Sequence, residues 1–305
     1  MAFGMSLRRF RYFVAVAAEL HVGRAAEHLG IAQPALSQQL RILEEELGVR
    51  LLRRVGRGIA LTEAGAAFLP EANAAIAQSE RAIGVARRTA RGELGTINIG
   101  YVNTAMLEAD LPGLLFAFRA SAPDARISLE EIAVQEQITA LEQHRLDIGI
   151  IRAPAGSLPN DLRVRRFTQS RLLAVVPAQL ASRLRQPVRL RDLADEPFIA
   201  LRDPDGIGLA HHVSTLCLRA GFTPRLDLRV DNASSIVGLV AAGFGVSVVP
   251  GALAQIGLAN VAFLELDDPD AHTELLIVHR PADLSPLKLR FLQLADRLLA
   301  DRSVG

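Results

Sequence analysis

The stretch QPALSQQLRILEEELG, at residues 33–48, fixes one element of the fold by its periodicity. Four leucines recur at helical spacing and form a single apolar stripe: Leu36, Leu40, Leu43 and Leu47. Pro34 suits a first helical turn, and Gly48 suits a helix end. The opposite face carries amide and hydroxyl side chains, where a solvated helix usually carries mixed charge. The stretch therefore predicts an amphipathic helix whose polar face is available for a specific contact.

Two helical segments precede this one. LRRFRYFVAVAAEL at residues 7–20 has apolar residues at helical spacing, and AAEHL at 25–29 is closed by Gly30. The turn at 30–32 then joins two helices in a helix-turn-helix arrangement, in which the second helix lies in the DNA major groove. We expect the outward side chains of that helix to meet base edges and phosphates: Gln33, Ser37, Gln38 and Arg41. An ordinary solvated helix is the alternative, because amphipathic helices with Gln and Ser are common.

The next stretch, VRLLRRVGRGIALTEAG, indicates a β-hairpin around an arginine-rich, glycine-punctuated turn. We expect Arg53, Arg54 and Arg57 to approach the phosphate backbone or the adjacent minor groove. Residues 1–60 hold nine arginines against five glutamates, a net charge of +4, whereas the whole chain has a formal net charge of +1. The N-terminal fifth of the chain is thus basic, as a nucleic-acid contact face requires.

A long alanine-rich helix is predicted after the hairpin, capped by Thr62 with Glu63 and extending to about Arg91. Leu69, Ile76 and Ile83 recur in it every seven residues. A helix of this length with so thin an apolar seam cannot bury that seam within one chain, so we interpret it as a dimerisation helix that links two domains.

Beyond RGELG at 91–95, short β runs alternate with helices, which predicts an α/β organisation with a parallel sheet. One set of strands is expected at 96–102, 125–132 and 146–151, with helices near 110–121 and 135–144. A second set is expected at 171–177, 198–201, 225–230, 245–250 and 261–266, after which TELLIVHR and the last helix return to the first set. Two lobes with a cleft between them are typical of small-molecule binding.

The expected domains are a winged helix-turn-helix at 1–62, a linker and dimerisation helix at 63–92 and a two-lobed α/β domain at 93–305. Within the last, lobe I is expected at about 93–165 and 267–305, and lobe II at about 166–266.

The segment AAEHLGIAQPALSQQLRILEEELGVRLLRRVGRGIALTEAG resembles the DNA-binding region of LysR-type transcriptional regulators, and LVAAGFGVSVVP resembles a strand signature of their effector domain. The resemblance covers the chain in order, and implies a winged head followed by a sensor related to the type 2 periplasmic binding proteins. It also implies homotetramers that bend promoter DNA and change the bend when a small inducer binds, with RNA polymerase as a further partner. By position, it assigns base-proximal roles to Gln33, Pro34, Ser37 and Gln38, and wing roles to Arg53 and Arg54. Leu52 stands where many members carry Phe.

Ligands of two-lobed α/β domains sit at the carboxyl ends of strands, where helix N-termini favour anions. Asn103 and Thr104 follow the first strand, and Thr104 resembles the hydroxyl residue with which relatives that sense aromatic-pathway acids hold a carboxylate. Val134 stands where those relatives often carry Thr, which leaves Gln135 as the polar contact. Arg152 matches an arginine that some relatives place beside the pocket.

The second lobe offers two further groups of candidates ahead of helices: Gly206, Ile207 and Gly208, and then Asn232 and Ser234. Each of these effector-site predictions has a structural alternative, since helix capping and ion pairing use the same residue types.

Other classes of protein fit the sequence less well. An enzyme would need a motif that the chain lacks: there is no nucleophile elbow, no H-E-x-x-H, and the single lysine, Lys288, follows Leu287 and so forms no Walker A loop. The adjacent His211 and His212 point about 100° apart on a helix and would not share one metal ion, so no metal or other cofactor is expected. A stand-alone solute-binding protein would leave the head and linker unexplained, and salt-dependent binding to duplex DNA would distinguish the two.

The location we expect is the cytoplasm. No apolar run reaches the 18 residues or more of a membrane span, and MAFGMSLRRF lacks the apolar region of a signal peptide. The single cysteine, Cys217, agrees with a reducing compartment. The expected function is therefore a DNA-binding transcriptional regulator that senses a small organic acid, with an aromatic acid or muconate as the favoured effector and an amino acid or another metabolite as the alternative.

Overall fold

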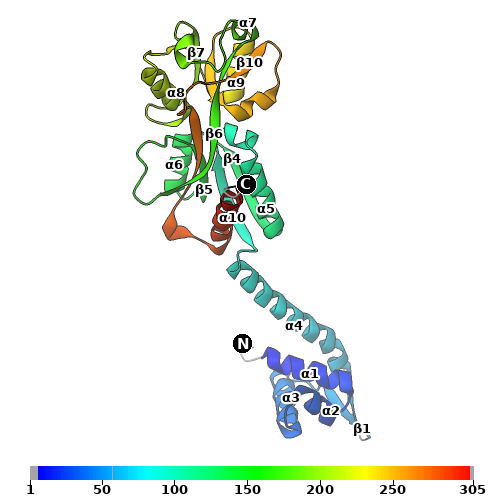
Figure 1. The fold of residues 1–305 in the computed structure, drawn as a ribbon. Helices are drawn as coiled ribbons and strands as arrows, with labels where there is room; N and C mark the ends of the chain where they lie inside the picture. The colour runs from blue at the N-terminus through cyan, green and yellow to red at the C-terminus, as the bar shows by residue number, and fades with distance from the viewer. Residues whose placement is uncertain (1–5, 57, 303–305) are drawn as a thin grey trace. The chain divides into compact units, whose positions relative to one another are not determined.

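The computed structural model describes residues 6–56 and 58–302 and divides into two compact units, one ending at Arg87 and the other beginning at Arg88 (Figure 1). Arg57, one of the predicted wing residues, lies outside the described residues. None of the helices in the described residues is long and apolar enough to cross a membrane.

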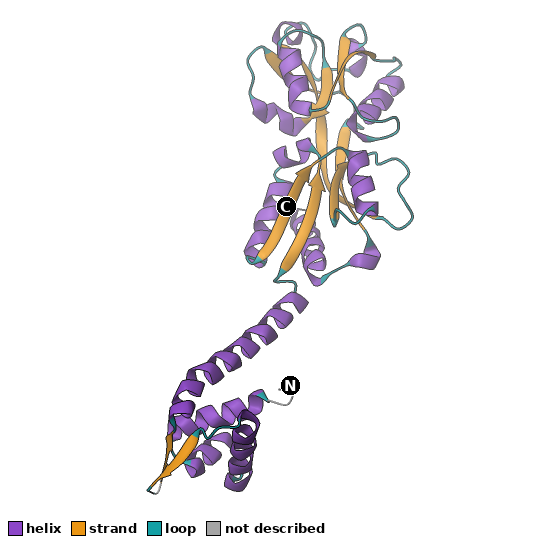
Figure 2. Cartoon of the chain, turned by 180° about the vertical axis from the view of Figure 1, so that it is seen from behind, coloured by secondary structure: helices purple, strands orange, loops and turns teal. Residues whose placement is uncertain are grey.

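The first unit holds the predicted head and most of the long helix that follows it. The head has three helices and a hairpin: α1 (Leu7–Glu19), α2 (Val22–Leu29), α3 (Gln33–Leu47), β1 (Leu52–Val55) and β2 (Gly58–Leu61). Figure 2 shows the two strands of the hairpin projecting beside the helices. The backbone of Gly30 has φ 66° and that of Gly48 has φ 71°, so both helices that precede them end in the left-handed conformation that glycine tolerates. The predicted leucine stripe of α3 is buried except for Leu47, which is half-buried, and it packs against Phe13 and Ala25.

The long helix α4 (Glu63–Ala90) begins where the capping signal predicted. Thr62 Oγ1 accepts a hydrogen bond from the Gly65 backbone N–H at 3.0 Å and donates one to the Arg50 carbonyl at 2.6 Å. Of its three predicted seam residues, Leu69 and Ile76 are half-buried, and Ile83 is 47% exposed.

The second unit begins with a parallel sheet, as predicted. Its lobe I strands are β3 (Gly95–Tyr101), β4 (Ala125–Glu131) and β5 (Ile148–Arg152), and β3 pairs in parallel with both of the others. Its helices are η1 (Asn103–Leu107), α5 (Asp110–Ser121), α6 (Val134–Glu142), η4 (Pro281–Asp283) and α10 (Pro286–Arg302). The late strand β11 (His272–His279) pairs antiparallel with β5, which confirms that TELLIVHR returns to the first set. Apolar side chains from both ends of the segment form one core, in which Phe118 and Phe291 meet edge to face at 5.3 Å.

Lobe II holds the parallel pair β7 (Pro197–Leu201) and β8 (Arg225–Val230). Its remaining elements are α7 (Ala178–Ala181), η2 (Leu190–Leu193), α8 (Gly208–Arg219), α9 (Ala233–Ala241), β9 (Ser247–Pro250), η3 (Gly251–Ile256) and β10 (Val261–Glu265).

One strand is longer than predicted and joins the lobes. The expected strand at 171–177 is the second half of β6 (Arg163–Pro177). Its first half pairs with β11, and its second half pairs with β9 and β10, all antiparallel, so the sheet is mixed rather than purely parallel. Figure 1 shows β6 running from the lower lobe into the upper one. The sequence did not predict this first half of β6, because most of the side chains at 163–171 are exposed and the residues are mainly polar or charged.

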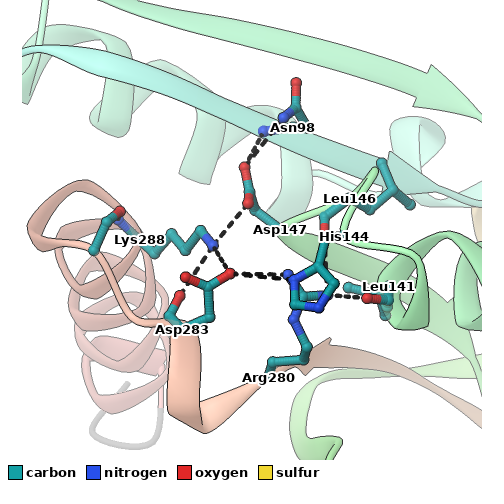
Figure 3. A network of polar contacts seen from close by, with 9 residues as sticks. Asn98, Leu141, His144, Leu146, Asp147, Arg280, Asp283 and Lys288 are labelled. Atoms are coloured by element: carbon teal, nitrogen blue, oxygen red, sulfur yellow. Dashed lines mark hydrogen bonds and ion pairs between the residues drawn. The ribbon is translucent and has the colours of Figure 1, made fainter.

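A charged network fastens the last helix to the sheet of lobe I (Figure 3). The Lys288 ammonium lies 2.7 Å from an Asp147 oxygen and 3.0 Å from an Asp283 oxygen, and Arg280 donates to the same Asp283 oxygen at 3.0 Å. The guanidinium of Arg280 and then the ammonium of Lys288 hold the pKa of Asp283 at about 2. Lys288 is therefore a structural residue that joins α10 to the start of β5.

Candidate functional site

The polar face of α3 is open to solvent along the residues that the sequence predicted. The side chains of Gln33, Pro34, Ser37, Gln38 and Arg41 are all exposed, whereas the leucines of the opposite face are packed into the head. Arg41 forms one ion pair, with Glu45 at 3.4 Å, and both partners are more than 60% exposed, so the pair is weak and readily exchanged for another partner. The face thus presents amide, hydroxyl and guanidinium groups, the types that bond to base edges and phosphates.

The described residues of the hairpin include two arginines that have no acidic partner among the described residues. β1 and β2 pair with Arg53 opposite Ala60 and Arg54 opposite Ile59, and both arginines are exposed. Within the described part of the chain, neither forms an ion pair. Successive strand residues point to opposite faces of a hairpin, so the two guanidinium groups extend in different directions and would contact different phosphates.

Glu44 fixes the hairpin to α3, and the sequence reasoning missed it. Its side chain is buried, Oε1 accepts from the backbone N–H groups of Leu51 (2.8 Å) and Leu52 (3.1 Å), and Oε2 pairs with Arg50 at 2.8 Å. The signal was present, since a glutamate four residues after Leu40 lies on the buried stripe of the helix. The wing therefore has a defined position relative to the exposed face of α3.

In the second unit, a cleft of about 150 Å³ opens where the parallel strands of both lobes end. Residues that follow β3 and β4 line it from lobe I, and residues that follow β7 and β8 line it from lobe II. The lining residues are Val102, Asn103, Thr104, Glu131, Ile132, Ala133, Val134, Leu201, Asp203, Asp231 and Ala233. This is the position at which α/β folds bind small molecules, beside the N-termini of α6 and α9.

Thr104 is the lining residue that a buried arginine holds in place through hydrogen bonds. It is 4% exposed, and its hydroxyl oxygen accepts from Arg152 Nε at 3.1 Å and from Arg152 Nη2 at 2.9 Å. Arg152 also pairs with the Glu108 carboxylate at 2.5 Å and donates to Thr273 at 3.4 Å. Burial lowers the pKa of Arg152, and the adjacent Glu108 raises it in turn. The arginine predicted beside the pocket thus forms a buried ion pair and orients Thr104, which faces the cleft.

The other predicted effector residues are placed around this cleft without lining it, except for Asn103, whose amide donates to Glu131 at 3.0 Å. Gln135 is exposed on α6. Gly208 donates its backbone N–H to the Pro154 carbonyl at 2.8 Å, so the segment of Gly206, Ile207 and Gly208 makes a backbone contact between the lobes.

Asn232 and Ser234 form a helix cap at the start of α9. The Asn232 side chain accepts from the Ser234 N–H at 2.8 Å and from its hydroxyl at 2.7 Å. These two residues therefore form a helix cap, which was the alternative to a ligand contact. A contact between either residue and a ligand stays a prediction.

Three acidic side chains in the cleft were missed: Glu131, Asp203 and Asp231. Asp203 Oδ2 accepts from the Ala210 N–H at 3.0 Å at the start of α8, and burial raises the pKa of its carboxyl group. Asp231 is largely exposed and pairs with Arg202 at 2.8 Å. The signal that could have found them is their position, because each stands at or just after the carboxyl end of a parallel strand.

The adjacent histidines of α8 are engaged separately. His211 Nδ1 accepts from the Gly206 N–H at 3.2 Å, and His212 Nε2 lies 2.7 Å from the His272 carbonyl oxygen. Across residues 6–56 and 58–302, no three His, Cys, Asp or Glu side chains are grouped so that they could hold a metal ion.

Comparison with known proteins matches both units. Residues 7–66 match the family described as bacterial regulatory helix-turn-helix protein, lysR family, and residues 90–300 match the LysR substrate binding domain. The chain is 36% identical over 274 residues to the uncharacterized HTH-type transcriptional regulator YnfL of Escherichia coli (strain K12), which covers 90% of this chain and 92% of that protein.

Two further similarities extend over nearly the whole length. The HTH-type transcriptional regulator TfdS of Cupriavidus pinatubonensis (strain JMP 134 / LMG 1197) is 35% identical over 295 residues, which covers 96% of this chain and 98% of that protein. The crystal structure of full-length CbnR complexed with its target DNA is similar with a TM-score of 0.83 at 29% identity, covering 96% of this chain and 99% of that one.

Proposed function

The chain belongs to the LysR family of bacterial transcriptional regulators, and on that premise we propose that α3 and the β1–β2 wing bind promoter DNA while the cleft between the lobes binds a small organic acid. The protein is a DNA-binding transcriptional regulator and not an enzyme. The observation that carries the assignment of the contact face is the exposed polar side of α3, whose apolar side is packed in the head.

For DNA, we assign base contacts to Gln33, Ser37 and Gln38 and phosphate contacts to Arg41 and the wing arginines. Gln can bond to adenine through both of its amide atoms, Ser can bond to several bases, and Arg favours guanine or phosphate. Pro34, in the first turn of α3, adds an apolar contact. The similarity to CbnR, which was crystallised on its target DNA, supports this orientation of the head.

For the effector, we assign a carboxylate to the end of the cleft formed by Thr104 and the N-terminus of α6. The α6 N-cap is Ala133, which has no side-chain hydrogen bond to the first turn, so backbone N–H groups there are available to a ligand. An aromatic acid is one class of compound with this group, and an amino acid is another.

Three further parts of the proposal rest on the family. We propose that α4 pairs two chains through Leu69, Ile76 and Ile83, that two such dimers form a tetramer, and that the assembly changes the bend of promoter DNA on effector binding. RNA polymerase would be the partner that responds to this change, and the cytoplasm would be the compartment.

The test of the DNA contacts is selection of bound duplexes from a random-sequence pool by the full-length protein. We expect a defined sequence preference, and we expect Ser37→Ala or Gln38→Ala to reduce discrimination by about 1–3 kcal/mol for each lost base contact. Ala66→Ser, an exposed change on α4, is the matched control. Recovery of the same sequences with equal discrimination by both α3 variants would contradict the proposed contacts.

The wing is tested by salt dependence. Binding should weaken as salt rises, and Arg53→Ala or Arg54→Ala should each reduce the slope of log affinity against log salt by about 1. A stand-alone solute-binding protein would show no salt-dependent binding to duplex DNA, and that result would overturn the proposal.

A further inference from the structure

The cleft has an acidic lining with no basic side chain in it. Glu131, Asp203 and Asp231 are among its lining residues, and no arginine, lysine or histidine is. A site for a simple organic anion normally supplies a cation, most often an arginine that forms two parallel hydrogen bonds with the carboxylate. The charge of this lining therefore does not match a ligand that carries only negative charge.

Two arginines that contact or adjoin lining residues are already engaged in ion pairs. Arg152, behind Thr104, is 3% exposed and pairs with Glu108, and Arg202 pairs with Asp231 at 2.8 Å. In the part of the chain that the structure describes, neither Glu131 nor Asp203 forms an ion pair. Two lining carboxylates thus have no cationic partner among the described residues.

Asp203 is the more constrained of these two carboxylates. It is half-buried, its hydrogen-bond partner in α8 is a backbone N–H, and burial raises the pKa of its carboxyl group. A cation beside it would stabilise its charged form. The side chain therefore suits a ligand that brings positive charge into the cleft.

Thr104, by contrast, offers the ligand a hydrogen-bond donor. Its hydroxyl oxygen accepts two hydrogen bonds from Arg152, so the hydroxyl hydrogen is left to donate. The Thr104 side chain is only 4% exposed and lines the cleft. Among the described residues, its hydroxyl hydrogen has no acceptor. Together with the N-terminus of α6, it calls for a hydrogen-bond acceptor on the ligand, most simply a carboxylate.

We propose that the effector is a small zwitterion, whose carboxylate binds Thr104 and the N-terminus of α6 and whose cationic nitrogen binds Glu131 and Asp203. This inference rests on the proposed function of the cleft and narrows it to the class of α-amino acids and related amino-carboxylates. A dicarboxylate such as cis,cis-muconate would bring two negative charges to this lining and is disfavoured.

The experiment compares ligands that differ by one charged group. Full-length protein is titrated calorimetrically with the proteinogenic amino acids, with the carboxylic acids that lack their amino group, with the amines that lack their carboxylate, and with cis,cis-muconate. L-Leucine, 4-methylpentanoate and 3-methylbutylamine form one such set. We expect one or more amino acids to bind at least tenfold more tightly than both of their matched relatives.

Variants then assign the two ends of the ligand. Glu131→Gln and Asp203→Asn keep the size of each side chain, and the Asn oxygen still accepts from Ala210. Each should weaken binding of the amino acid at least tenfold, whereas any binding of the deaminated acid should be unchanged or tighter, because a negative charge has been removed from the lining. Thr104→Val should weaken both. Glu142→Gln, an exposed change at the C-terminal end of α6 and outside the lining, is the control and should alter neither.

Two results would overturn the inference. One is tighter binding of a deaminated acid or of muconate than of any amino acid, which would leave the organic-acid proposal intact. The other is the absence of binding by every amino acid in the panel. Selection of DNA by the same protein preparation reports on the head alone, so a failure of the regulator assignment would be recognised separately.

Discussion

Gly65, in the first turn of α4, is the position where one added methyl group should do most harm to the head. A Cβ built there would lie 2.0 Å from the Leu51 carbonyl oxygen and 2.9 Å from its carbon, distances that real Cβ atoms essentially never show. Both atoms belong to the backbone, so no side-chain rotation relieves the clash. The chain before β1 would have to move, and the 2.9 Å hydrogen bond from Thr62 N–H to the same oxygen would be lost.

The magnitude follows from three contributions. Overpacking costs about 1–3 kcal/mol, a lost backbone hydrogen bond costs about 1 kcal/mol, and the higher helix propensity of alanine returns about 1 kcal/mol. Gly65→Ala should therefore destabilise the head by about 1–3 kcal/mol, which lowers the melting temperature of a domain of this size by roughly 4–8 °C for each kcal/mol.

The assay is thermal unfolding of the full-length protein together with its affinity for duplex DNA, which should also fall because Leu51 leads into the wing. Gly113→Ala is the control, since that helical glycine is exposed and has no atom within 4 Å of an added Cβ; its melting temperature should be unchanged or raised. A Gly65→Ala protein as stable as the parent, with unaltered DNA affinity, would refute the reasoning.

Three more predictions concern the second unit. Arg152→Ala should cost about 3–5 kcal/mol in chemical denaturation, because Glu108 would be buried without its cation; a loss below about 1 kcal/mol would contradict a structural ion pair. Asp283→Asn should lower the melting temperature at pH 7. The difference from the parent should shrink as pH falls from about 4 towards 2, because the Asp283 carboxyl, whose pKa in the folded protein is about 2, stabilises the fold only while it is charged. A difference that does not change with pH would contradict a stabilising role for this charge. The Cys217 thiol, whose pKa burial raises to about 12, should resist a thiol reagent at pH 8 until the protein is unfolded, and rapid modification of the native protein would show that it is accessible.

Local pattern was sufficient for most elements. The spacing of apolar residues predicted α1, α2 and α3 and most strands to within a few residues. A helix or strand that buries one face has apolar residues at a regular short spacing in its sequence. Thr62 was identified as a cap for the same reason, since its partner Gly65 is three residues away. The first half of β6 was not predicted. Its side chains are mostly exposed and many are charged, and its strand conformation depends on its pairing with β11.

The cleft depended on contacts that sequence spacing does not record. Its position could be anticipated, because parallel strands bring their carboxyl ends to one edge, and Asn103 and Thr104 were predicted on that basis. The role of Arg152 could not be decided, because its partners Glu108 and Thr273 lie 44 and 121 residues away. The acidic lining was missed for a related reason, since Glu131, Asp203 and Asp231 come from three different strand ends.

The sequence by itself determined the order of domains, the helix α3 with its exposed polar face, and the family, because each depends on residues that are neighbours along the chain. Only the tertiary structure decided which charges meet: Arg152 with Glu108, Arg202 with Asp231, and, among the residues that the structure describes, no cation with Glu131 or Asp203. Charge acts through space, so the electrostatic character of the cleft, and with it the class of ligand that it favours, is set by the folding together of distant segments.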